Sequence, residues 1–179
     1  MPIKPNSTWL LIGSFLTLLG SILAFKLIYD PPKIANIFKN VKPAALNIVK
    51  PEKIFLGQPF KINLVIDSAK QDVNAVGIYL KFESDKIQIL DLDTTESFCQ
   101  FYPEKKFDNH LGTVTIACGS PHPGFSGTNT LATIELMPLA IGTTHLAVDP
   151  NSKVLLSDGR GTNTLTEPVG TDFVVQTTL

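Results

Sequence analysis

The segment Val73-Asn74-Ala75-Val76-Gly77-Ile78-Tyr79-Leu80-Lys81-Phe82 alternates large apolar residues with small or polar ones. One parity holds Val76, Ile78, Leu80 and Phe82, and the other holds Ala75, Gly77, Tyr79 and Lys81. Because successive side chains of a β-strand point to opposite faces, this pattern predicts a strand that buries one face. Tyr79 and Lys81 are expected on the exposed face.

The same alternation recurs on both sides of this segment. It covers residues 60–67, 113–118, 132–137 and 143–148, with turn residues between the segments. Residues 86–93 have apolar residues at both parities, which predicts a bulge or cover on both faces. With no convincing amphipathic helix in this region, the pattern predicts an all-β, two-sheet sandwich of seven to nine strands.

The N-terminus has a different character. Residues 9–25 carry no charge, and with Leu27, Ile28 and Tyr29 the run reaches the ~20 residues that a transmembrane helix needs. The sequence therefore predicts an N-terminal signal anchor or transmembrane helix at residues 1–30, a linker at 31–43 and one sandwich domain at 44–179. The end of the apolar run has no good small-x-small cleavage site. This favours an uncleaved anchor over a removed signal peptide.

The orientation of the anchor rests on two opposing signals. Four lysines follow the apolar run and only Lys4 precedes it, which by the positive-inside rule favours a cytoplasmic domain. Two cysteines and a sandwich fold favour an extracytoplasmic one. We expect a single-pass membrane protein with its domain outside the cytoplasm.

Charge and motifs exclude several function classes. Fifteen Lys and Arg against sixteen Asp and Glu give a net charge of −1, so no strong positive field favours nucleic acid. The sequence has no G-x-S-x-G motif, no H-E-x-x-H motif and no phosphate-binding glycine loop. We therefore expect a protein that is not an enzyme and needs no cofactor.

Several turns and strands together resemble a cohesin domain. Gly57-Gln58-Pro59-Phe60-Lys61-Ile62 opens an alternating strand, and residues 73–82 run into Glu83-Ser84-Asp85-Lys86-Ile87. Gly124-Phe125-Ser126-Gly127 then precedes Leu131-Ala132-Thr133-Ile134, and Ser157-Asp158-Gly159-Arg160-Gly161 forms a late acidic-glycine turn. The resemblance implies a nine-stranded jelly-roll that binds a dockerin module on one sheet face without catalysis.

Carried over to this chain, the resemblance places the strand 73–82 on the binding face. The outward residues Ala75, Gly77, Tyr79 and Lys81 would then contact a dockerin-like partner. Ala75 and Gly77 depart from the hydrogen-bonding side chains common in the family, but an exposed tyrosine among small residues suits a protein interface.

Cys99 and Cys118 are the only cysteines. In an oxidising compartment they would close a loop of about twenty residues with a disulfide. The alternative is two unpaired, buried thiols.

A carbohydrate-binding module is the alternative function. Phe98, Phe101, Tyr102 and Phe107 fall in the loop-rich stretch 96–110, where Phe101 and Tyr102 could stack on a polysaccharide. The other interpretation of these aromatic residues is cover for the end of the sandwich. A third reading is a structural component of the cell envelope.

Metal sites have weaker support. Asp149, Asn151, Ser152, Asp158 and Asn163 collect oxygen atoms near two turns, but the same sequences are ordinary turns without EF-hand spacing. The three histidines are too dispersed for a zinc signature. We predict no metal site, and a membrane-anchored binding module that serves an extracellular, polysaccharide-related assembly.

Overall fold

A computed structural model describes residues 42–177. These residues form an all-β sandwich with no helix, and therefore contain no helix able to span a membrane. The predicted anchor at 1–30 and nearly all of the linker at 31–43 lie outside the described residues.

The four-stranded sheet has the order β1-β3-β8-β5 and is antiparallel throughout. Its strands are β1 (Ala45–Val49), β3 (Phe60–Asp67), β8 (Thr128–Pro138) and β5 (Ile87–Asp93). The register shifts between Ile89 and Asp91, which leaves Leu90 exposed. The bulge predicted for residues 86–93 is therefore confirmed, and it explains the apolar residues at both parities.

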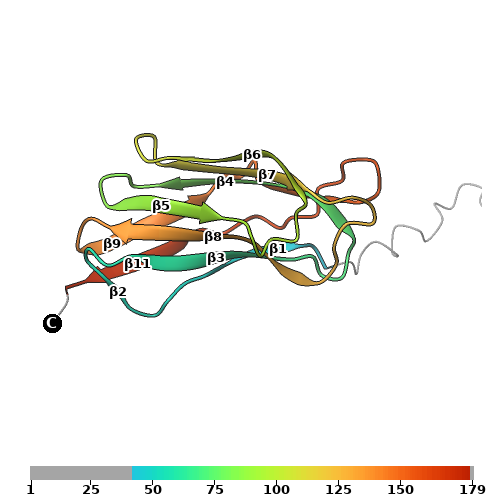
Figure 1. Cartoon of the computed structure of the whole chain (residues 1–179). Helices are drawn as coiled ribbons and strands as arrows, with labels where there is room; N and C mark the ends of the chain where they lie inside the picture. Colours follow the sequence, from blue (N-terminus) through green and yellow to red (C-terminus); the bar gives the residue numbers. More distant parts are fainter. Residues whose placement is uncertain (1–41, 178–179) are drawn as a thin grey trace, which may run out of the picture. The chain divides into compact units, whose positions relative to one another are not determined.

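The seven-stranded sheet has the order β2-β11-β9-β4-β7-β6, with β10 also paired to β4. Its strands are β2 (Ile54–Phe55), β11 (Thr171–Gln176), β9 (Gly142–Val148), β4 (Val73–Phe82), β7 (Thr113–Gly119), β6 (Phe101–Asp108) and β10 (Lys153–Leu156). Figure 1 shows the strands of the two sheets running along a common direction.

The core lies between the two sheets and comes from the predicted inward parity. Ile62, Leu64, Ile78, Leu80 and Ile134 are each at most 1% exposed. The opposite parity of these strands faces outward, as expected for antiparallel sheets with one buried face. Burial of these aliphatic side chains supplies the main driving force for folding, at roughly 25 cal/mol per Å² of apolar surface.

Two expectations need correction. The described residues contain eleven strands and not about nine, because short strands such as β2 and β10 add to the main ones. The stretch 96–110, expected to be rich in loops, contains the eight-residue strand β6. This strand lies at the sheet edge and pairs only with β7. Its charged residues can therefore stay in solvent, and Pro103 is tolerated because an edge strand has one side without a partner strand.

Candidate functional site

The centre of the candidate site is the outer surface of the seven-stranded sheet over β4. All four predicted contact residues lie on this surface, with Tyr79 and Lys81 exposed and Ala75 and Gly77 half-buried. Thr115 of β7 is the register partner of Tyr79, and Lys106 of β6 is the register partner of Thr115. The residues on this face therefore come from three neighbouring strands.

A hollow of about 730 Å³ opens on this surface. Residues of β4, β6, β7 and β10, together with the turn between β6 and β7 and the segment between β9 and β10, surround it. They are Tyr79, Leu80, Lys81, Lys106, Phe107, Asp108, Leu111, Thr113, Val114, Thr115, Asp149, Asn151 and Lys153. Two of the four predicted contact residues, Tyr79 and Lys81, line the hollow.

Tyr79 lies along its own strand toward Gly77. A Cβ atom added at Gly77 would sit 3.6 Å from the Tyr79 Oη atom, which is ordinary van der Waals contact. Alanine would fit at this position, whereas a larger side chain must displace the ring. The small residue keeps Tyr79 flat on the sheet, with 37% of the residue exposed.

Strands β9 and β10 pair with different parts of β4, and the turn Asp149–Ser152 lies between them. This turn pairs with the backbone of Tyr79. The Tyr79 N–H donates to Ser152 Oγ at 3.1 Å, and the Tyr79 C=O accepts from the Asp149 N–H at 2.8 Å. Ser152 is 2% exposed, so its hydroxyl satisfies a backbone group that would otherwise lack a partner. This turn brings Asp149 and Asn151 to the hollow.

Asp149 is held in its ionised form. Its carboxylate accepts the Asn151 backbone N–H at 2.9 Å and lies 3.1 Å from the Lys81 ammonium. These contacts, with the Asn151 N–H the larger, lower the pKa of Asp149. Lys81 is therefore held beside Tyr79 by a counter-ion from the segment between β9 and β10.

A second ion pair lies on the edge strand β6. Lys106 Nζ and Glu104 Oε1 are 2.6 Å apart, and the hydrogen bond that Lys106 donates to Glu104 raises the pKa of Lys106. Their side chains remain 68% and 40% exposed, so salt screens this pair strongly.

Phe101 and Tyr102 do not share a surface. Phe101 is 54% exposed, and its ring tip covers Gly119, where an added Cβ would come within 2.3 Å of Phe101 Cζ. Tyr102 packs against the core with a buried hydroxyl group. The structure therefore places only Phe101 of this pair on the outer face.

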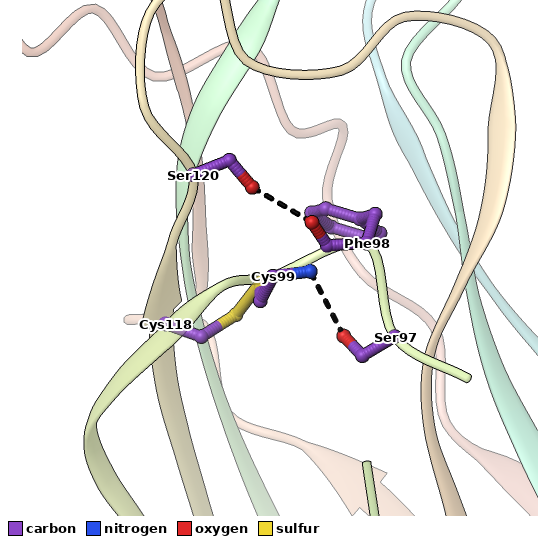
Figure 2. The surroundings of a disulfide bond; sticks show 5 residues. All are labelled: Ser97, Phe98, Cys99, Cys118 and Ser120. Atoms are coloured by element: carbon purple, nitrogen blue, oxygen red, sulfur yellow. Dashed lines mark hydrogen bonds between the residues drawn. A yellow bond between two sulfur atoms is a disulfide. The ribbon is translucent and has the colours of Figure 1, made fainter. Parts of the chain in front are cut away.

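Cys99 and Cys118 form a disulfide with a Cα–Cα distance of 5.9 Å (Figure 2). It joins the segment before β6 to the end of β7. Two hydrogen bonds support this segment, from Ser120 Oγ to Phe98 O at 2.8 Å and from Cys99 N to Ser97 Oγ at 3.2 Å. Figure 2 shows these contacts gathered around the disulfide. The free thiol alternative is absent from the described structure.

Other polar residues considered from the sequence serve local structure. Asp158 accepts the Arg160 N–H and the Thr162 hydroxyl, and Asn163 accepts the Val154 N–H. His145 pairs with Asp172 at 2.6 Å on the surface. Residues 42–177 contain no group of three His, Cys, Asp or Glu side chains placed to hold a metal ion.

Reasoning from the sequence missed the contributions of neighbouring strands to the hollow. Lys106, Thr115 and Lys153 reach it because β7 and β10 pair with β4, and β6 pairs with β7. From the sequence, Asp149 and Asn151 are candidates for cation ligands or for ordinary turn residues, and not for a binding surface. The available signal was the Asp149-Pro150-Asn151 turn, which interrupts an otherwise continuous strand pattern.

No protein-family model and no curated protein matches the chain. Solved structures do match, and several are cohesin modules. The third cohesin ScaC of Acetivibrio cellulolyticus, in complex with the ScaB dockerin, has a TM-score of 0.63 and 11% identity. The alignment covers 74% of this chain and 98% of that chain.

Two further matches come from other settings. A non-cellulosomal cohesin of the archaeon Archaeoglobus fulgidus has a TM-score of 0.61 and 11% identity, covering 75% of this chain and 92% of that one. The cohesin module of a family 33 glycoside hydrolase from Clostridium perfringens has a TM-score of 0.60 and 13% identity, covering 76% and 99%. The described domain therefore has a cohesin-like fold, as the sequence resemblance predicted.

Proposed function

We propose that this chain is a non-catalytic protein-binding module that receives a dockerin-like module on the outer face of β10, β4, β7 and β6. The main observation behind this proposal is the hollow around Tyr79 and Lys81 on a cohesin-like fold. The ScaC cohesin, which shares this fold, occurs in complex with a dockerin. The binding role of the face is carried over from such neighbours as part of the proposal.

The surface chemistry supports a protein partner. Tyrosine is enriched in protein interfaces, where its ring buries apolar area and its hydroxyl finds a hydrogen bond. At this site, Tyr79 lies among small residues and two ion pairs, which resembles the mixed apolar and polar character of such interfaces.

A polysaccharide ligand has less support on this face. Of the two residues predicted to stack on sugar rings, Tyr102 packs inward and only Phe101 faces outward. We therefore rank the protein partner first and use polysaccharide retention as a control.

The proposal places the domain outside a bacterial cell. A disulfide between Cys99 and Cys118 suits an oxidising compartment, which supports the extracytoplasmic orientation. The apolar N-terminal segment would hold the module at the membrane, and the linker would give it reach toward a partner in a polysaccharide-related assembly.

Capture of the partner tests the proposal. The full-length chain, immobilised in detergent, is incubated with secreted proteins of the source organism, beside an insoluble-polysaccharide retention assay. We expect the wild type to retain a protein bearing a dockerin-like module. Tyr79→Ala should weaken retention by about tenfold or more, as expected for a tyrosine at the centre of an interface.

Leu90→Ala is the matched control. Leu90 is 42% exposed, against 37% for Tyr79, but lies at the bulge of the opposite sheet. It should leave retention unchanged. Equal retention by Tyr79→Ala and wild type would refute the proposed face, and retention on polysaccharide without a protein partner would reverse the ranking.

A further inference from the structure

The exposed charge around the hollow is mainly positive. Lys81 is 67% exposed at its side chain, whereas its partner Asp149 is 17% exposed. Lys106 is 68% exposed and its partner Glu104 is 40% exposed. In each pair the lysine side chain is thus more exposed to solvent than the acidic one.

The carboxylates lining the hollow are already used within the domain. Asp149 accepts two hydrogen bonds from Asn151 through Oδ1 and contacts Lys81 through Oδ2. Asp108 Oδ1 accepts the backbone N–H groups of His110 and Leu111, at 2.8 and 3.0 Å. Both acids therefore serve the folding of their own turns and offer few free lone pairs to a ligand.

Lys153 differs from the other two lysines. It lines the hollow and is exposed, and its ammonium group makes no hydrogen bond or ion pair with any residue between 42 and 177. Its register partner on β4 is Gly77, which has no side chain to approach it. Lys153 thus brings an uncompensated positive charge to one side of the hollow, opposite the β6 side that carries Lys106.

We propose that the hollow receives an acidic segment of the partner protein, with a carboxylate against Lys153 and an apolar or aromatic neighbour against Tyr79. This inference rests on the proposed function, because it specifies the partner surface that meets the same face. The lysines supply complementary charge, which favours encounter and selects against basic partners. The ring of Tyr79 supplies the apolar contact between the charged positions.

A defined peptide pair tests the chemistry directly. The probe is a blocked peptide with two Asp and two Glu residues around one Trp, and its control replaces each acid with the matching amide. Each is titrated into the ¹⁵N-labelled full-length chain in zwitterionic micelles, and amide shifts are mapped by NMR. We expect the acidic peptide alone to shift the signals of Tyr79, Thr115 and Lys153, and its affinity to fall as salt rises.

Two variants complete the test. Lys153→Gln should weaken binding of the acidic peptide by about two- to fivefold, the range of an exposed ion pair. Lys61→Gln is the control, because Lys61 is exposed on β3 of the other sheet. Equal shifts with the amide peptide, shifts centred away from the hollow, or no shifts with the acidic peptide would overturn the inference.

The captured partner separates this inference from the proposed function. If its binding is lost in Tyr79→Ala but is unaffected by Lys153→Gln and by salt, the face is correct and the acidic segment is wrong. If Tyr79→Ala binds as the wild type does, the proposed face is wrong, and the inference of an acidic segment on that face is refuted with it.

Discussion

At the bulge in β5, the side chain of Asn109 makes the two backbone hydrogen bonds that a neighbouring strand would otherwise make. Its side-chain Oδ1 accepts the Ile89 N–H at 2.8 Å, and its Nδ2 donates to Ile89 C=O at 2.9 Å. One amide side chain therefore satisfies both backbone groups of a residue whose side chain is buried in the core. This contact also links the turn between β6 and β7 to β5 of the opposite sheet.

We expect Asn109→Ala to lower the free energy of unfolding by about 1–3 kcal/mol, because it leaves the Ile89 N–H and C=O without their partner. Urea unfolding of the full-length chain measures the change. Asn109→Asp is the control, since it keeps the acceptor and loses the donor, and should fall between wild type and alanine. An alanine variant as stable as the wild type would show that water replaces the amide at no cost.

Glu83 makes the stability of the domain depend on pH. Its carboxylate accepts Lys86 Nζ at 2.7 Å and the His145 backbone N–H at 3.1 Å. The hydrogen bond from Lys86 is the larger cause, and together these contacts lower the pKa of Glu83 from 4.5 to about 2. A carboxyl group with a lowered folded-state pKa stabilises the fold above its ordinary pKa and loses this effect as pH falls toward 2.

We therefore expect the melting temperature of the wild type to fall more steeply than that of Glu83→Gln between about pH 4.5 and 2. Other acids contribute equally to both proteins, so the difference between the two curves isolates Glu83. Circular dichroism melts across this range measure it. Parallel curves would mean that Glu83 gains nothing from Lys86 and His145 in the folded state.

At the scale of elements, the disulfide secures the edge strand β6. This strand pairs only with β7, and its register shifts between Phe101 and Glu104. Cys99 lies two residues before β6 and is tied to Cys118 in β7, so the strand is fixed at its start as well as along its ladder. The bond also keeps Phe101 near Gly119 on the outer face.

Replacing both cysteines by serine should cost about 3 kcal/mol of stability by the loop-entropy model. Denaturant unfolding measures this cost, and the exposure of Phe101 should rise in the same variant. Labelling supplies the chemical check on the bond itself. If both thiols of the denatured, unreduced wild type react with a maleimide, the disulfide is not formed in the protein.

The sequence was informative wherever a strand has one buried and one exposed face. Residues 60–67 and 73–82 alternate for this reason, and the structure places β3 and β4 at the predicted segments. Strand β6 lacks the signal because it is an exposed edge with charged residues and Pro103. The composition of the hollow could not be predicted, since Lys106 and Lys153 join Tyr79 around it through cross-strand register and not through sequence spacing.

At the scale of the whole molecule, the core, the seven-stranded sheet and the hollow are connected. A hydrophobic core fixes two sheets, and the seven-stranded sheet presents Tyr79 in a hollow. We propose that a partner module docks in this hollow. The hollow lies on the outer face of the seven-stranded sheet. Lys61 and Leu90 are exposed on the outer face of the four-stranded sheet and do not line the hollow. The claim therefore predicts binding on one face only.

Lysine footprinting of the full-length chain with its captured partner tests this claim most directly. The rates of acetylation of Lys81, Lys106 and Lys153 are compared by mass spectrometry with and without the partner, and Lys61 serves as the internal reference. We predict protection of the three lysines around the hollow and an unchanged rate at Lys61. Protection at Lys61 with unchanged rates at the other three would place the partner on the opposite face and contradict the account.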